Sequence, residues 1–259
     1  MWDEFLDWIA EYDHFLGWGL ITFNSVIILL LLIAKSRKVD VHGEIEQLNI
    51  AFTIAHPDDE SMFFLPAIKS LSKKHNLYLL CLSNGDFDGL GKTREKELEK
   101  AAAFLKFKKL KIVDDLDLPD GMNAQWSQDK IAKYVTEFVD EHKVNVLISF
   151  DQFGVSGHPN HISVFHGTRE ALKQLKKQPR YQDMSMFSLI TTGFVRKYIG
   201  IFDAPLTMLN QSDYYNWNPF TAYTAMKCHW SQFVWFRKLF IIFSRYAYMN
   251  SFEEVPLNQ

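Results

Sequence analysis

The stretch LNIAFTIAHPDDE, residues 48–60, joins an apolar run to a cluster of polar residues. Residues 48–55 are rich in apolar and β-branched side chains, which is typical of a buried strand. His56 follows directly, and after one proline come three consecutive acids, Asp58, Asp59 and Glu60. Core packing gives no reason for such a cluster, whereas metal chemistry does.

The pattern on either side of this stretch predicts an α/β domain. Apolar, strand-like runs alternate with segments of helical periodicity. We expect strands at 48–55, 76–82, 109–115 and 144–150, and helices at 65–75, 93–107, 127–142 and 161–177. This alternation favours a Rossmann-like, doubly wound parallel sheet with helices on both faces.

Composition narrows the class of protein. The chain has 259 residues, enough for one sizeable domain with a modest appendage or for two small domains. The net charge of −3 and the lack of a dense basic face give no support to nucleic-acid binding. The two cysteines, Cys81 and Cys228, are far apart and favour reduced core thiols over a disulfide framework.

Residues 15–34 carry no charge and are long enough to cross a bilayer. Acidic residues precede this segment and Lys35, Arg37 and Lys38 follow it, so the basic side should remain cytoplasmic. We therefore predict a lumenal N-terminus at 1–14, a transmembrane helix at 15–34 and a juxtamembrane linker at 35–47. Residues 48–259 then form a cytoplasmic domain.

Two other interpretations of residues 15–34 compete with the membrane anchor. A cleaved signal peptide would have a basic start and a cleavage site of small residues after the run, and neither is present. A buried core helix would rarely be this long and uncharged.

The residues after the first strand have the character of a catalytic zinc site. His56 and Asp59 are three apart at the strand exit, where a tight turn can aim both side chains at one point. Asp58, between them, is free to act as a general base toward a metal-activated water. The alternative is that the three acids simply begin the next helix, where negative charge is favourable.

A second loop, GVSGHPNH at 154–161, follows the fourth strand as HPDDE follows the first. His161 can supply a third ligand, which leaves one position open as in catalytic zinc sites. As an imidazolium, His158 could then stabilise the oxyanion of a tetrahedral intermediate or protonate a leaving amine. The alternative is an ordinary turn with a histidine at a helix start.

Together, AHPDDE, TREKEL and GVSGHPNH resemble the PIG-L/LmbE family of zinc-dependent de-N-acetylases, over about residues 48–250. The resemblance implies that His56, Asp59 and His161 bind Zn²⁺ (another divalent metal is possible), that Asp58 is the general base and that His158 steadies the oxyanion. Asn160 departs from the bacterial members of the family, many of which have Asp there, and this puts a charge-relay role at that position in doubt.

Further candidates fit this resemblance less sharply. Arg94 and Glu97 match an Arg-x-x-Glu pattern of the family, and Arg94 could bind a phosphate or sugar of the substrate. The alternative is an i,i+3 pair on the surface. Asp120 could hold sugar hydroxyls, or could be a turn residue before Gly121. His229 is a weaker candidate.

The segment 229–250 is dense in aromatic residues and interrupted by Arg237, Lys238 and Arg245. The charges exclude a second transmembrane span. Either a helix lying in the membrane interface or a helix packed on the sheet accounts for this pattern.

The resemblance and the anchor together imply a membrane-bound zinc amidase of the endoplasmic reticulum. Its substrate would be a glycolipid, an N-acetylglucosamine joined to phosphatidylinositol, deacetylated early in GPI-anchor biosynthesis. The alternatives are a catalytically idle membrane tether that binds a sugar lipid or a partner, and a zinc amidase acting on another N-acetyl sugar conjugate.

Overall fold

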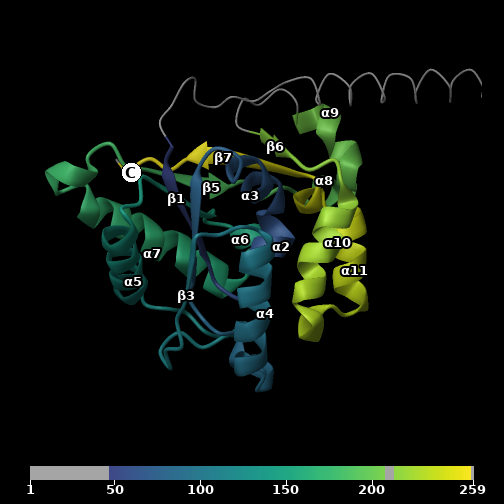
Figure 1. Ribbon diagram of the computed structural model, residues 1–259, viewed down its shortest axis with the longest axis horizontal. Helices are drawn as coiled ribbons and strands as arrows, with labels where there is room; N and C mark the ends of the chain where they lie inside the picture. The colour runs from purple at the N-terminus through teal and green to yellow at the C-terminus, as the bar shows by residue number, and fades with distance from the viewer. Residues whose placement is uncertain (1–46, 208–212, 258–259) are drawn as a thin grey trace, which may run out of the picture.

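Figure 1 shows the computed structural model, which describes residues 47–207 and 213–257. Its centre is a sheet in the order β3-β2-β1-β4-β5-β7-β6. The strands are β1 (Asn49–Ile54), β2 (Asn76–Cys81), β3 (Lys109–Ile112), β4 (Val146–Phe150), β5 (Ser185–Leu189), β6 (Asp213–Tyr215) and β7 (Met249–Glu254). Strands β1 to β5 are parallel, whereas β7 is antiparallel to both β5 and β6.

Helices connect these strands and cover both faces of the sheet. The α-helices are α2 (Asp59–Phe63), α3 (Leu65–Leu71), α4 (Gly91–Phe104), α5 (Gln128–His142), α6 (Gly154–Gly157), α7 (Pro159–Leu175), α8 (Phe194–Tyr198), α9 (Ala204–Thr207), α10 (Pro219–Cys228) and α11 (Trp235–Phe243). Short 3-10 helices are η1 (Asp86–Asp88), η2 (Pro179–Tyr181), η3 (Gly200–Asp203), η4 (Trp230–Gln232) and η5 (Arg245–Ala247).

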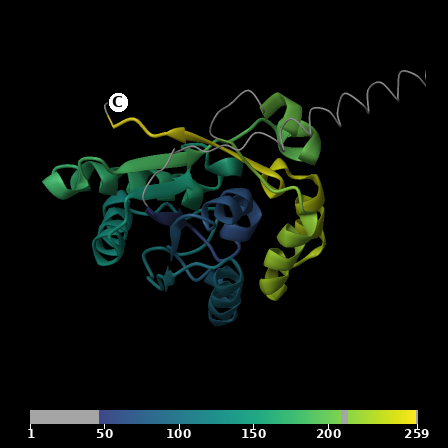
Figure 2. The ribbon, with the colours of Figure 1, turned by 45° about the horizontal axis from the view of Figure 1, so that its top comes forward.

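The helices form two layers. Helices α5 and α7 pack on each other and on β1, while α3 and α4 pack on the parallel strands from the other side. Figures 1 and 2 both show α5 and α7 on one side of the molecule and α10 and α11 on the opposite side. The strand order 3-2-1-4-5 reverses direction between β1 and β4, and open α/β sheets bind ligands at such a switch point.

The core is built around β1, whose residues 50–54 are buried between β2 and β4. The Phe52 ring packs edge-to-face on Phe64 and Phe107, with centroids 5.8 and 5.9 Å away. Helices α5 and α7 approach closely at Gly167, where an added Cβ would lie 2.4 Å from Cβ of Ile131. A burial of this extent is the main stabilising contribution to the fold.

The α/β architecture with a mostly parallel sheet is confirmed, but three predictions need correction. Strands β6 and β7 make the sheet mixed rather than parallel. Segment 229–250 is not one helix: α11 spans only residues 235–243, because Ser244 takes extended backbone and the chain then enters η5 and β7. Cys81 is a buried free thiol, but Cys228 is only half-buried.

The predicted membrane anchor at 15–34, with its flanks 1–14 and 35–46, lies outside the described residues. Within residues 47–207 and 213–257, the structure has no helix of the length and apolar character needed to span a bilayer. The anchor therefore stays a prediction.

Candidate metal and catalytic site

The candidate site lies at the carboxyl ends of β1 and β4, which are neighbours in the sheet. His56, Asp58 and Asp59 follow β1 directly. His158 and His161 lie at the start of α7, which the loop and short helix α6 connect to β4. Because parallel strands end at the same edge, these two loops meet although they are about a hundred residues apart in sequence.

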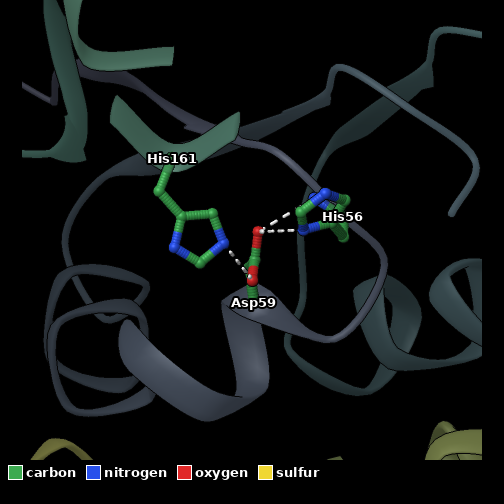
Figure 3. Close-up of side chains that lie close together, drawn as sticks. All are labelled: His56, Asp59 and His161. Carbon is green, nitrogen blue, oxygen red and sulfur yellow. Dashed lines mark hydrogen bonds and ion pairs between the residues drawn. The ribbon is translucent and has the colours of Figure 1, made fainter. Parts of the chain in front are cut away.

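Three buried side chains converge there, as Figure 3 shows. One donor atom from each of His56, Asp59 and His161 lies within 4.8 Å of the others. Nε2 of His161 lies 3.3 Å from Oδ1 of Asp59, and Nδ1 of His56 lies 3.9 Å from Oδ2. The predicted convergence of these three side chains on one point is therefore present.

Each of the three side chains is oriented by a further hydrogen bond. Oδ2 of Asp59 accepts from the backbone N–H groups of Ala55 and His56, at 3.0 and 2.8 Å. Nδ1 of His161 lies 3.2 Å from the Gly154 carbonyl, which can only accept, so Nδ1 carries the proton and Nε2 presents a lone pair. Such carbonyl contacts typically orient metal-binding histidines.

His56 is held in the same way from its other side. Its Nε2 lies 3.0 Å from Oδ1 of Asp120 and 3.0 Å from Oδ1 of Asn160. These acceptors assign the proton to Nε2, so Nδ1 faces Asp59 with a lone pair. Two imidazole lone pairs and a carboxylate oxygen thus point toward one region, which is a suitable donor set for Zn²⁺ or a similar divalent ion.

A second group, His56, Asp120 and His158, also brings donor atoms within 4.8 Å. It is less suited to a metal, because Asp120 already pairs with Nη1 of Arg94 at 3.2 Å. It would also need a lone pair on Nε2 of His56, which carries a proton toward Asp120. We therefore assign the metal site to His56, Asp59 and His161.

Electrostatics support an ionised carboxylate at the centre of this site. Burial alone would raise the pKa of Asp59, but the adjacent His161 and His56 lower it well below the ordinary value. Burial alone would lower the pKa of His56, but the hydrogen bond to Asp120 and the charge of Asp59 raise it. A cation is thus favoured between these groups.

Asp58 adopts backbone angles that are unusual for a residue with a side chain, with φ at 117°. Strain of this kind is found most often at functional sites. Its carboxylate pairs with two guanidinium groups. Oδ2 lies 2.9 Å from Nη2 of Arg237, and Oδ1 lies 3.7 Å from Nη2 of Arg94.

Arg94 is buried and is not part of a surface ion pair with Glu97, so that alternative is wrong. Its Nη2 donates to the Pro57 carbonyl at 2.8 Å and its Nη1 to the Gly85 carbonyl at 2.9 Å. Gly85 has a φ of 71°, which favours glycine, and a Cβ there would lie 2.5 Å from the Arg94 guanidinium and displace it. Arg94 braces the turn that carries Asp58, and its predicted contact with substrate stays a prediction.

Asp120 is a partner of both His56 and Arg94 rather than only a turn residue. It lies in the loop between β3 and α5, a third loop at the same edge of the sheet. The predicted contact of Asp120 with sugar hydroxyls stays a prediction.

His158 is the residue that caps the N-terminus of α7, where its Nδ1 accepts from the backbone N–H of Asn160 at 3.2 Å. The proton therefore lies on Nε2. Burial, reinforced by the neighbouring His161 and His56, lowers the pKa of His158 to about 4. The ring is then neutral near pH 7, which favours donation of a hydrogen bond over the imidazolium role considered from the sequence.

Asn160 is fully buried, and its Oδ1 accepts a hydrogen bond from the Gly121 N–H as well as from His56. Its Nδ2 donates to the Ala124 carbonyl at 2.8 Å, which fixes the orientation of the amide. Asn160 thus positions the His56 ring. A neutral amide can do this without relaying charge.

Two further contacts were not predicted from the sequence. Nε2 of His229 lies 2.7 Å from Oε1 of Glu60, and both side chains are fully buried. Arg237 from α11 reaches Asp58. No spacing rule links residues about 170 positions apart. The sequence does show a further acid, Glu60, beside the predicted metal ligands, and basic residues within segment 229–250, as candidates for such contacts.

The sequence of this chain is similar to those of known proteins. Residues 51–172 match the family model PIG-L, described as GlcNAc-PI de-N-acetylase. A probable N-acetylglucosaminyl-phosphatidylinositol de-N-acetylase of Schizosaccharomyces pombe is 36% identical over 249 residues, covering 89% of this chain and 98% of the relative. The enzyme of that name from Bos taurus is 35% identical over 204 residues, covering 76% of this chain and 79% of the relative.

Solved structures share the fold. N,N'-diacetylchitobiose deacetylase from Pyrococcus horikoshii superposes with a TM-score of 0.56 at 19% identity, over 80% of this chain and 84% of the other. The 4-carboxy-2-hydroxymuconate hydratase GalB from Pseudomonas putida also gives 0.56, at 12% identity, over 81% of this chain and 97% of the other. The fold alone thus does not determine the reaction. By its sequence matches, however, the chain belongs to the PIG-L family of GlcNAc-PI de-N-acetylases.

Proposed function

We propose that this chain hydrolyses the acetamide of N-acetylglucosaminyl-phosphatidylinositol, releasing acetate and glucosaminyl-phosphatidylinositol, as an early step of GPI-anchor biosynthesis. The relatives named for this activity support the choice of substrate. The observation that carries the chemistry is the buried cluster of His56, Asp59 and His161 at the switch point of the sheet, with the strained Asp58 beside it.

The cluster would hold a divalent ion through Nδ1 of His56, Nε2 of His161 and a carboxylate oxygen of Asp59. Such an ion supplies an acidified water and polarises the amide carbonyl. We infer Zn²⁺ because two imidazoles and one carboxylate with a vacant position suit a catalytic zinc site. The residues that surround the cluster would then transfer the proton and stabilise the developing negative charge.

Asp58 accepts the proton of the water that attacks the acetamide carbon, and it later passes this proton to the departing amine. Arg237 and Arg94 keep its carboxylate in place. His158 presents Nε2–H to the carbonyl oxygen as negative charge develops there. The carbon–nitrogen bond breaks, acetate takes the hydroxyl, and the glucosamine nitrogen leaves as the free amine.

We further propose that the enzyme is a single-pass protein of the endoplasmic reticulum membrane with a cytoplasmic catalytic domain. This follows from the uncharged segment 15–34 and the basic residues after it. A lipid-linked substrate is consistent with such an anchor.

Acetate release by the purified full chain tests the proposed function. We expect acetate from N-acetylglucosaminyl-phosphatidylinositol, loss of this activity with a chelator, and recovery when Zn²⁺ is returned. A soluble N-acetylglucosamine conjugate should be a poor substrate by comparison. Equal rates on both would indicate an amidase of broader specificity, and no acetate from either, with metal bound, would indicate an inactive tether.

A further inference from the structure

Helix α11 has an outer face that is apolar, although it is exposed. Trp235, Phe236, Leu239, Ile242 and Phe243 recur at helical spacing on one side, and their exposed fractions range from 45 to 72%. The outer side of a helix at a water-exposed surface normally carries polar residues. A contiguous apolar face of this kind indicates a contact with something other than water.

The inner face of the same helix touches the candidate site. Arg237 pairs with Asp58 at 2.9 Å. Phe240 packs edge-to-face on Phe63, with ring centroids 5.6 Å apart, and Phe63 in turn packs on the His161 ring at 5.7 Å. Only the thickness of one helix, about 10 Å, therefore separates the outer face from the catalytic groups.

Neighbouring elements extend this surface. Helix α8 and η3 pack against α11. Phe194 and Val195 on α8 are exposed to 78 and 70%, and Phe202 on η3 to 63%. In Figures 1 and 2 these segments lie together at the side of the molecule opposite α5.

Charge and composition distinguish between occupants of this surface. Helices α8 and α11 contain no acidic residues. Three of their four basic side chains, Arg196, Lys197 and Arg237, bond to groups of the chain itself, and the fourth, Lys238, is exposed. The carboxylate of η3, Asp203, is fully buried. Tryptophan and phenylalanine flanked by lysine or arginine, without exposed acids, are typical of helices that lie at the surface of a bilayer containing anionic lipid.

We propose that the outer face of α11, extended by α8 and η3, docks on the lipid bilayer and presents the catalytic site to a substrate embedded in it. The inference rests on the proposed function, because a glycolipid substrate is embedded in the bilayer that the enzyme must approach. Docking positions the bilayer surface about one helix diameter from Asp58. A sugar headgroup can then enter the site while its acyl chains remain in the membrane.

The test uses the full chain and two substrates. L239Q/I242Q makes two exposed positions of the face polar and leaves Arg237 and Phe240 unchanged. The matched control is L116Q, because Leu116 is 95% exposed and follows Asp115, which bonds to α5 on the opposite side. Substrates are long-chain N-acetylglucosaminyl-phosphatidylinositol, in phosphatidylcholine vesicles with some phosphatidylserine, and a short-chain soluble analogue.

For L239Q/I242Q we expect the KM for the vesicle substrate to rise about tenfold, with kcat and the kinetics on the soluble analogue unchanged. L116Q should match the unsubstituted chain on both substrates. An unchanged KM for the vesicle substrate in L239Q/I242Q would overturn the docking while leaving the proposed function intact. Absence of acetate from both substrates would instead contradict the proposed function.

A measurement without catalysis tests docking independently. A nitroxide is attached at Leu239→Cys in a Cys228→Ser background, with Cys81 buried, and the chain is placed in nanodiscs of the same lipids. Docking predicts relaxation by dissolved oxygen but not by a water-soluble nickel complex, with the reverse at Leu116→Cys. Access of nickel to position 239 overturns the proposal, and protection from both agents does so too, because it shows a protein segment there.

Discussion

Two buried polar clusters in this molecule differ in whether their carboxylate already has cationic partners. Around Asp203, the fully buried carboxylate meets matched donors: Nε of Arg245 at 2.6 Å, Nε of Arg196 at 2.7 Å and Oγ1 of Thr207 at 2.8 Å. Around Asp59, the carboxylate oxygen and two imidazole lone pairs face one another. In the first cluster the carboxylate is already paired with two guanidinium groups, whereas the acceptors of the second cluster need a cation.

The difference separates a structural role from a binding role. A buried charge that is fully paired holds two segments in register, here η3 and η5. A buried group of acceptors without a cation is costly unless it serves to bind one. Substitutions in the two clusters should therefore affect different properties of the protein.

The largest expected effect is on catalysis. Asp58→Asn should lower kcat by a factor of about 10² to 10⁴, because the general base is lost while the strained backbone, which Asn tolerates, is retained. Metal content should remain, measured by atomic absorption of the purified chain. His161→Ala should lose both metal and activity.

The control for these variants is Asp183→Asn, at an exposed carboxylate in the turn before β5. It should leave rate and metal content unchanged. Full activity in Asp58→Asn would show that another group takes the proton. Metal retained by His161→Ala would contradict the assignment of metal binding to the Asp59 cluster.

In the Asp203 cluster the effect should be on stability. Arg245→Met leaves a buried carboxylate with fewer partners and should lower the free energy of unfolding by about 3–5 kcal/mol. Metal content per folded molecule should not change. Urea unfolding measures this, with the exposed Arg180→Met as the control. A stability change equal to that of the control would mean that the Asp203 cluster contributes nothing.

Added Zn²⁺ should stabilise the folded chain through the Asp59 cluster and not through the Asp203 cluster. Zn²⁺ at about a hundred times its dissociation constant should stabilise the folded chain by about 2.7 kcal/mol, because it binds only the assembled cluster. Arg245→Met should keep this increment on its lower baseline, and His161→Ala should lose it. An equal increment in all three proteins would place the binding of Zn²⁺ elsewhere.

A third cluster, which is partly buried at the surface, should show the smallest effect. The hydrogen bond from Lys130, aided by the Asp117 N–H and the Tyr134 hydroxyl, lowers the pKa of Asp115 to about 2. Since the folded pKa is depressed, the stabilisation is complete above the unfolded value near 3.9 and is lost as pH falls toward 2. Solvent screening limits it to about 0.5–1 kcal/mol.

Urea midpoints of the unsubstituted chain and Asp115→Asn, followed against pH, measure this contribution. Their difference should be constant at neutral pH and shrink on acidification. A difference that grows on acidification would contradict the direction of the pKa shift.

The sequence predicts the parts of the molecule that depend on local pattern. The first four strands and their helices lie where hydrophobic periodicity places them, and the loops after β1 and β4 meet because a parallel sheet brings strand ends together. The order of the motifs along the chain is therefore enough to predict that these two loops meet.

The remaining contacts depend on segments that pattern alone does not pair. Strand β7 lies within a stretch rich in aromatic residues that also suits a helix, and it is paired with β5 only through tertiary packing. The contact of Arg237 with Asp58 requires the first turn of α11 to pack beside the loop after β1. The lowered pKa of His158 follows from its burial beside the His161 and His56 rings, which residue spacing in the sequence does not reveal.

The central claim is that the loops after β1 and β4 hold one divalent ion. Anomalous diffraction from crystals of the full chain grown with Zn²⁺ tests it most directly. We predict one peak about 2.0–2.2 Å from Nδ1 of His56, Nε2 of His161 and a carboxylate oxygen of Asp59, with Asp58 unliganded. A peak bound by Asp120 and His158 instead, or a folded site with no peak, would contradict it.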